Sequence, residues 1–121
     1  VVEKGLARTY ENLRKAYELG ITITIGSDSF SFVTPYGYVT IDEMYDFVDK
    51  VGVSILDTIS AATYNGAKML GKEDEFGAVK EGLSADLLVV KGDVASNIHD
   101  LTPENMDVIM KEGTIITRGS F

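Results

Sequence analysis

Hydrophobic side chains in the first twenty residues recur at helical spacing. Leu6, Tyr10, Leu13 and Tyr17 are separated by four, three and four positions, and charged side chains occupy most of the positions between them. This spacing places the apolar side chains on one face of a helix. Gly20 follows, and glycine readily takes the left-handed conformation that ends a helix. We therefore expect an amphipathic helix that ends at Gly20.

The pattern changes directly after this glycine. Residues 21–25 alternate isoleucine and threonine, and alternating β-branched residues predict a strand. The strand is expected to end at the sequence Gly26-Ser27-Asp28-Ser29. The next segment, residues 30–39, follows neither the helical nor the strand period and is expected to form a long loop.

Two further helices are predicted in the middle of the chain. Thr40 and Glu43 have the spacing of a capping box, in which a hydroxyl and a carboxylate satisfy free N–H groups at a helix start. Apolar side chains then repeat at helical spacing up to Gly52. A second helix is expected to start at Ser54, and Asn65-Gly66 is expected to bend or split it.

After residue 71 the chain consists of short apolar stretches between glycines. Four segments are expected to form strands: 76–82, 85–93, 107–113 and 114–120. Glu112-Gly113 has the composition of a hairpin turn between the last two. The chain therefore divides near residues 70–75 into an α/β part and an all-β part.

Length and charge exclude several classes of protein. The 121 residues are less than half of the ~250 that a closed (β/α)₈ barrel needs. With 11 Lys and Arg against 19 Asp and Glu, the net charge is −8, which repels phosphate backbones and anionic lipids. We expect neither nucleic acid nor a membrane as a partner. The absence of cysteine excludes thiolate metal sites and fits a cytoplasmic location.

Asp28 is the strongest candidate for chemistry. It follows a predicted strand, and parallel α/β folds place their working residues at the carboxyl ends of strands. Ser-Asp-Ser is also an ordinary turn sequence, so the residues alone favour a turn-capping role. The only histidine, His99, is expected to be a surface or hydrogen-bonded residue. The four acidic residues of the second helix are expected to form a solvated face without chemistry: Asp42, Glu43, Asp46 and Asp49.

Several motifs, taken in order, resemble one known family. They are IxIxIGSDS, EMYDFVDKVGVS, AATYNGAKMLG, FGAVKEGLSADLLVVKGD and VIMKEG. Together they resemble the C-terminal third of the amidohydrolase superfamily of metal-dependent hydrolases, in its imidazolonepropionase-like and Xaa-Pro dipeptidase-like branch. The resemblance runs from about Asn12 to Gly113. The first residue is Val1 and not Met, which fits a piece of a longer protein.

The resemblance implies an α/β fold made of two partial domains. Residues 1–72 would be the last βα units of a TIM-type (β/α)₈ barrel, with residues 21–25 as its eighth strand. Residues 73–121 would be the C-terminal strands of a small β-sandwich, a composite domain that normally also takes strands from the N-terminus. The expected partner is the remainder of the barrel or another copy of the chain.

The resemblance also implies a role for Asp28. In the family, this aspartate contacts the catalytic divalent metal, expected to be zinc, and takes a proton from the attacking water. Bound metal makes this transfer feasible because it lowers the pKa of water from about 15.7 to about 7. The family's histidine and lysine or glutamate ligands have no counterpart in this sequence. One aspartate cannot hold a catalytic zinc, so this chain alone is expected to be inactive and to bind no metal tightly.

The function expected from the resemblance is hydrolysis of an amide-type C–N bond in a small molecule. A cyclic amide and an Xaa-Pro dipeptide are the substrate types that the resembling branch implies. Two alternatives stay open at this point. One is a non-catalytic binding or assembly module derived from the same fold, and the other is a parent enzyme with deaminase chemistry.

Overall fold

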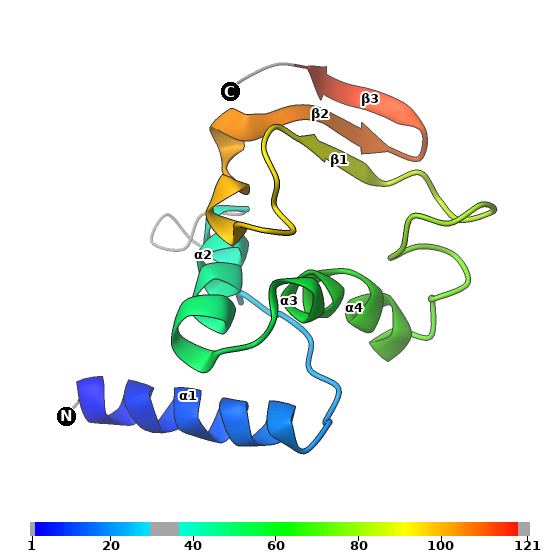
Figure 1. The fold of residues 1–121 in the computed structure, drawn as a ribbon. Coiled ribbons are helices and arrows are strands. Elements are labelled where there is room, and N and C mark those ends of the chain that lie inside the picture. Colours follow the sequence, from blue (N-terminus) through cyan, green and yellow to red (C-terminus); the bar gives the residue numbers. More distant parts are fainter. Residues whose placement is uncertain (1, 30–36, 119–121) are drawn as a thin grey trace.

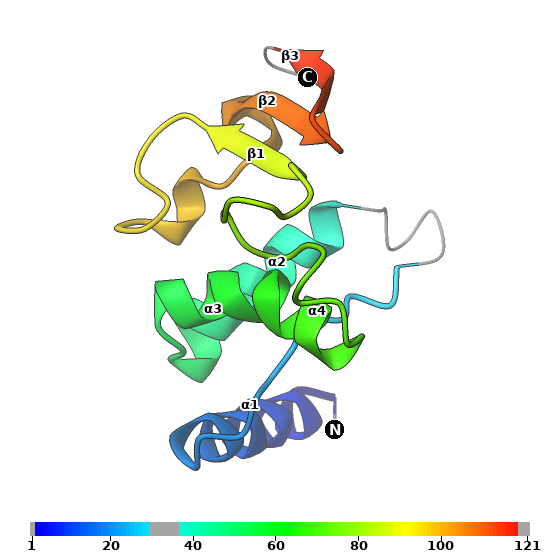
Figure 2. The ribbon, with the colours of Figure 1, turned by 90° about the vertical axis from the view of Figure 1, so that its right-hand side faces the viewer.

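The computed structural model describes residues 2–29 and 37–118, which form three tiers (Figures 1 and 2). Helix α1 (Val2–Glu18) lies at one end of the molecule. The middle tier holds helices α2 (Tyr38–Asp46), α3 (Ile55–Ala62) and α4 (Tyr64–Met69). The tier at the other end is a sheet of β1 (Leu87–Val90), β2 (Met106–Lys111) and β3 (Thr114–Arg118). Three short helical segments complete the fold: η1 (Phe47–Val51), η2 (Ile98–Asp100) and η3 (Pro103–Asn105). Among the described residues, the longer helices lie in the first half of the chain and the strands in the second.

Helix α1 packs through the apolar face that its sequence predicts. Tyr10, Leu13 and Tyr17 lie against the buried cluster of the middle tier. The guanidinium of Arg14 adds a polar contact, because it donates hydrogen bonds of 2.6 Å to the Val51 carbonyl and 2.8 Å to the Lys50 carbonyl. These carbonyls end a helical segment and lack partners within it. Arg14 therefore ties α1 to the end of η1.

The continuous run of α2 and η1 forms the centre of the molecule. Phe47, Val51, Val53 and Ala61 form one buried cluster on the side of α1. A second buried cluster faces the sheet: Met44, Ile98 and Leu101. Ile25 packs against both clusters. The core of the helical half thus continues into the β-rich half through α2.

The expected strand at residues 21–25 is wrong as a secondary-structure element. The segment has no strand hydrogen bonds within the described residues, because a strand requires neighbouring strands to pair with its N–H and C=O groups. Single contacts hold it instead. Ile25 N–H donates to the Ala61 carbonyl at 3.1 Å, and the Asn65 side-chain amide donates to the Ile23 carbonyl at 2.8 Å. The expected alternation survives in part, since Ile23 and Ile25 pack into the core while Ile21 is exposed.

The helix predicted after Ser54 starts where expected, but it is split into two helices at a different residue from the one predicted. The Ser54 hydroxyl accepts a hydrogen bond from the Asp57 N–H, as a helix N-cap does. The break falls at Thr63, whose backbone leaves the helical region (φ −130°, ψ −87°). The expected break at Asn65-Gly66 is wrong, since both residues lie inside α4. Asn65 holds the Ile23 carbonyl from this helix.

Three of the four expected strands form an antiparallel sheet in the order β1-β2-β3. The hairpin at Glu112-Gly113 is confirmed. Both residues have positive φ, 50° and 78°, which is the conformation of the two-residue turn that matches strand twist. The Asp86 carboxylate supports this turn, because it accepts hydrogen bonds from the Glu112 N–H at 2.7 Å and from the Lys111 ammonium at 2.8 Å.

The strand expected at residues 76–82 is absent from the described structure, and the segment forms turns and bends. Gly77 and Gly82 have φ of 100° and 90°, which no β-strand residue adopts. Gly77 also lies directly against α4, since a Cβ built on it would be 2.6 Å from the Ala67 Cβ. The start of the segment therefore packs against α4.

The loop expected at residues 30–39 lies largely outside the described residues, and its last two residues belong to α2. Within the described part of the chain, no helix has the length and apolar character that a membrane crossing requires.

Candidate functional site

Asp28 follows residues 21–25 in the described segment after α1, and it is exposed while Ser27 and Ser29 are half-buried. Its φ is 47°, in the left-handed region. Aspartate and asparagine tolerate this region better than most residues other than glycine. A conformation of this kind persists where the surrounding structure holds it, and such residues gather at functional sites.

Three hydroxyl groups surround the backbone of Asp28. The side-chain oxygens of Ser27 and Ser29 lie 2.9 Å apart, and Thr40 of α2 donates a 3.2 Å hydrogen bond to the Ser27 hydroxyl. The serines on either side of Asp28 are therefore linked to one another and, through Ser27, to the first turn of α2. Their hydroxyls hold the loop in shape.

Glu43 lies one turn further along α2. Burial raises the pKa of Glu43 above its ordinary value, the Gly26 N–H opposes this rise, and the nearby charge of Asp46 adds to it. The Oε2 atom is buried and has no hydrogen-bond partner within the described structure.

These contacts correct the capping-box prediction. Gly37 is the N-cap of α2, and no side-chain hydrogen bond caps this helix. Thr40 and Glu43 lie inside the helix, and Thr40 donates to the Ser27 hydroxyl instead. The two side chains share one helix face, since residues three positions apart are neighbours on a helix surface.

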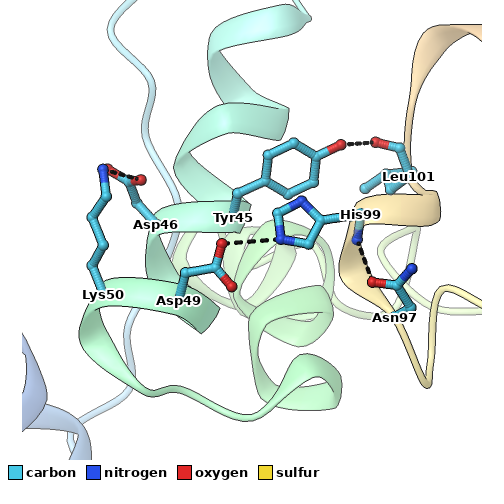
Figure 3. Close-up of polar contacts among 7 residues, drawn as sticks. All are labelled: Tyr45, Asp46, Asp49, Lys50, Asn97, His99 and Leu101. Atoms are coloured by element: carbon cyan, nitrogen blue, oxygen red, sulfur yellow. Dashed lines mark hydrogen bonds and ion pairs between the residues drawn. The ribbon is translucent and has the colours of Figure 1, made fainter.

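The acidic residues of the second helix also do more than the sequence predicts. Asp46 accepts a hydrogen bond from the Tyr10 hydroxyl of α1 and pairs with Lys50 at 2.7 Å. Asp49 lies 3.0 Å from Nε2 of His99 in η2 (Figure 3). Asp46 and Asp49 thus connect this helix to other segments of the chain, which the sequence did not predict. Asp42 and Asp49 are exposed, as expected for a solvated face.

His99 is hydrogen-bonded, as the sequence predicts, and it lies in a contact between η2 and the central helix. Its ring stacks at a tilt on the Tyr45 ring with a centroid separation of 4.4 Å, and its backbone N–H donates to the Asn97 side chain at 3.2 Å (Figure 3). His99 thus links η2 to the central helix through its contacts with the Asp49 and Tyr45 side chains.

A complete metal site does not form from the residues that the structure describes. No three or more histidine, cysteine, aspartate or glutamate side chains of residues 2–29 and 37–118 are arranged to hold a metal ion. A catalytic zinc needs about three protein ligands and an open position, and Asp28 supplies one. The described chain therefore does not fit a metal by itself.

An open hollow of about 340 Å³ lies between α1 and the α3–α4 pair. Tyr17, Ile23, Asp57, Tyr64 and Asn65 are among its lining residues, and Asp28 is not. Asp57 is already engaged there, since it accepts a 2.6 Å hydrogen bond from Tyr17. The hollow is thus separate from the loop that carries Asp28.

Comparison with known protein families shows which family the chain belongs to. The model of the amidohydrolase family matches residues 3–116, nearly the whole chain. The chain belongs to the amidohydrolase family. This confirms the resemblance drawn from the sequence motifs, and it places the Gly26–Ser29 loop of this amidohydrolase segment inside the matched region.

Individual relatives show how this amidohydrolase segment compares in length. It is 27% identical to the imidazolonepropionase of Thermoanaerobacter pseudethanolicus (strain ATCC 33223 / 39E) over 85 residues, which cover 70% of this chain and 20% of that protein. It is 27% identical to adenine deaminase 4 of Rhizobium meliloti (strain 1021) over 114 residues, 89% of this chain and 17% of that protein. The structure of a Xaa-Pro dipeptidase with bound methionine in its active site aligns with a TM-score of 0.77 and 35% identity, covering 91% of this chain and 25% of that one.

The chain therefore spans about a fifth of the curated relatives' length and a quarter of the matched structure. The fold is shared with part of an amidohydrolase structure. The sequence analysis singled out Asp28 and missed Thr40 as a partner of its loop. A polar residue at this helix start was present in the sequence, but a capping box explained it equally well.

Proposed function

We propose that this chain is the C-terminal part of a longer amidohydrolase that hydrolyses an amide-type C–N bond. The match of the family model to residues 3–116 supports this proposal, as does the share of the relatives' length that the chain covers. In this proposal, residues 1–72 complete a (β/α)₈ barrel and residues 73–121 complete a small β-sandwich.

The remainder of the barrel is the partner that this proposal requires. Residues 21–25 have the alternating pattern of a strand and only scattered backbone hydrogen bonds. Neighbouring barrel strands would supply the missing partners and turn the segment into the eighth strand. The exposed side chains of Leu19 and Ile21, which are 79% and 56% accessible, would then lie close to other polypeptide.

The single observation that carries the functional proposal is the placement of Asp28. Its carboxylate is exposed, on a loop held in the left-handed conformation at the end of residues 21–25. In a barrel, this end of the strand is where catalytic residues lie. Asp28 would accept a proton from the attacking water and return it to the departing nitrogen. The water oxygen bonds to the carbonyl carbon, and the C–N bond breaks.

A divalent metal, with zinc as the proposed ion, would acidify the water in the complete enzyme. Of its ligands, this chain would contribute Asp28, and the others would come from the remainder of the barrel. The proposed substrates follow from two of the relatives: a cyclic amide from the imidazolonepropionase, and an Xaa-Pro dipeptide from the Xaa-Pro dipeptidase.

Deamination is the second candidate reaction, and the match to an adenine deaminase over 89% of this chain favours it. The two reactions release different products. An amide hydrolase releases a carboxylate together with an amine, whereas a deaminase replaces an amino group with oxygen and releases ammonia. A non-catalytic module would release neither.

The complete protein, purified with its metal, should be assayed with a cyclic amide, with methionyl-proline and with adenine. We expect a carboxylate product from one of the first two and no ammonia from adenine. Ammonia release from adenine as the main activity would show a deaminase. No turnover of any of the three by metal-loaded protein would favour the non-catalytic module.

A further inference from the structure

We propose that Thr40 is a positioning residue, whose hydroxyl holds the two serines beside Asp28 so that the Asp28 carboxylate keeps its place against the reacting water. This inference rests on the proposed function, in which Asp28 is the proton acceptor. It assigns a role to a side chain of α2 that follows Asp28 by twelve positions in the sequence and does not itself touch substrate.

The first observation is the exposure of the residues in the Gly26–Ser29 loop. Asp28 is exposed, whereas Ser27 and Ser29 on either side of it are half-buried. The loop thus presents the carboxylate to solvent and keeps both serines against the rest of the protein. A group that holds the two serines therefore holds the backbone on both sides of Asp28 and leaves its carboxylate accessible.

The second observation is a continuous chain of three hydroxyl groups. Thr40 donates to the Ser27 hydroxyl at 3.2 Å, and the hydroxyls of Ser27 and Ser29 lie 2.9 Å apart. A hydroxyl has one proton to donate and two lone pairs that accept, so Ser27 can accept from Thr40 and still donate to Ser29. All three residues are half-buried, and a hydrogen bond is stronger where water is partly excluded. The chain connects the loop to α2.

The third observation is that Thr40 stands on an anchored turn of α2. Its neighbour Ile41 packs against the buried cluster that faces the sheet, and Met44, one turn further along, is a buried member of that cluster. The start of the loop is anchored separately, because the Ile25 N–H donates to the Ala61 carbonyl at 3.1 Å. Thr40 therefore ties the middle of the loop to a fixed base.

The fourth observation is the left-handed backbone of Asp28. Its φ is 47°, in a region that residues other than glycine enter at a cost, and such a conformation persists where the surrounding contacts hold it. Without the Thr40 hydroxyl, the two serines lose this tie to α2. Asp28 can then return to an ordinary conformation, and its carboxylate leaves its position although the residue is still present.

The placement of Asp28 determines its efficiency in the proposed reaction. A proton acceptor must lie within hydrogen-bond reach of the group that it deprotonates, and a displacement of about 1 Å can cost about 100-fold in rate. Thr40 contributes one neutral hydrogen bond to this placement. We therefore expect its loss to slow the reaction by less than the removal of Asp28 does.

The test uses the complete, metal-loaded enzyme and three variants. Thr40→Val removes the hydroxyl, keeps the shape of the side chain and should lower kcat by about 5- to 50-fold, with KM within about 3-fold of the parent. Thr40→Ser keeps the hydroxyl and should hold kcat within about 3-fold of the parent. Thr9→Val is the matched control, since the exposed Thr9 hydroxyl bonds the Gly5 carbonyl within α1. Its kcat should equal that of the parent.

A double-mutant cycle with Asp28→Asn separates positioning from a general structural role. If Thr40 acts through Asp28, then Thr40→Val should change kcat by less than about 2-fold in the Asp28→Asn background. Crystal structures give a readout other than rate, because Asp28 of the Thr40→Val enzyme should leave the left-handed region, wholly or as a second conformer. If Thr40→Val does not fold, Ser27→Ala replaces it in the cycle and in the crystals, with the same expected results.

Four results would each overturn the positioning role. They are a Thr40→Val loss of less than about 3-fold, an equal loss in both backgrounds, a Thr40→Ser enzyme as slow as Thr40→Val, and an Asp28 that keeps its conformation in the variant crystal. The proposed function fails separately: an Asp28→Asn enzyme with parental turnover overturns the role of Asp28, and the positioning role ends with it. An Asp28→Asn enzyme that loses turnover, beside a Thr40→Val enzyme that keeps it, overturns the positioning role alone.

Discussion

The phenol of Tyr45 donates a 2.6 Å hydrogen bond to the main-chain carbonyl of Leu101, 56 residues later in the chain (Figure 3). Leu101 is 8% exposed, so its carbonyl has little access to water. The bond joins the central helix to the segment that precedes the sheet. It connects the two halves of the chain where residues of both halves form one buried apolar cluster.

Tyr45→Phe should weaken this connection without changing the fold. The substitution leaves a largely buried carbonyl without its donor, which costs about 1 to 2 kcal/mol of unfolding free energy. Urea unfolding followed by circular dichroism measures the loss. Tyr38→Phe is a matched control, because the Tyr38 side chain is exposed and its replacement should change the unfolding free energy by less than about 0.5 kcal/mol. Equal stability of the two variants would contradict the role of the Tyr45 bond.

Alanine substitutions at Gly77 and Gly82 distinguish the cost of backbone strain from the cost of a steric clash. Both have positive φ, 100° and 90°, so an alanine at either position is strained by about 1 to 2 kcal/mol. Only at Gly77 would the new Cβ collide with a neighbour, the Ala67 Cβ at 2.6 Å, while Gly82 has no atom within 4 Å. Gly77→Ala should therefore lower the unfolding free energy by about 1 to 3 kcal/mol more than Gly82→Ala. Thermal unfolding of the two variants compares them, and equal losses would show that α4 does not contact the segment this closely.

Asp86 should make the stability of the sheet depend on pH. The hydrogen bond from Lys111 and then that from the Glu112 N–H hold the pKa of Asp86 below its ordinary value. A carboxyl group with a lowered folded-state pKa stabilises the fold above its unfolded pKa of about 3.9, and the contribution disappears as pH falls through the folded pKa. The stability difference between the parent and Asp86→Asn should be constant from pH 5 to 7 and shrink below about pH 4. Urea midpoints at several pH values measure it, and a difference that grows on acidification would contradict this sign.

Local patterns in the sequence predicted much of the fold. The spacing of Tyr10, Leu13 and Tyr17 identified the buried face of α1, and Ser54 marked the start of α3. Glu112-Gly113 identified the hairpin. In each case the decisive interaction lies within a few residues, so the local sequence contains the information.

Predictions failed where distant residues decide the structure. Residues 21–25 have the pattern of a strand, but no segment of the described chain pairs with them as a neighbouring strand. Residues 76–82 form turns in place of a strand, and Gly77 approaches Ala67 of α4. No local pattern shows this contact. Asp28 was singled out by its place after a predicted strand and by the family motifs, and its catalytic role stays a prediction. The contact of Thr40 with Ser27 is visible only in the three-dimensional structure, because the sequence fits a helix cap equally well.

Turnover by the complete enzyme with Asp28 replaced by asparagine tests the proposed role of this chain most directly. Asparagine tolerates the left-handed conformation at this position, so the unfolding temperature should be unchanged. It cannot accept the proton from water, so kcat should fall by at least about 100-fold. Metal content, measured on the same samples, shows how much of the loss is due to a missing ligand. A variant with near-parental kcat would show that Asp28 only shapes a turn, and would contradict its role as the proton acceptor.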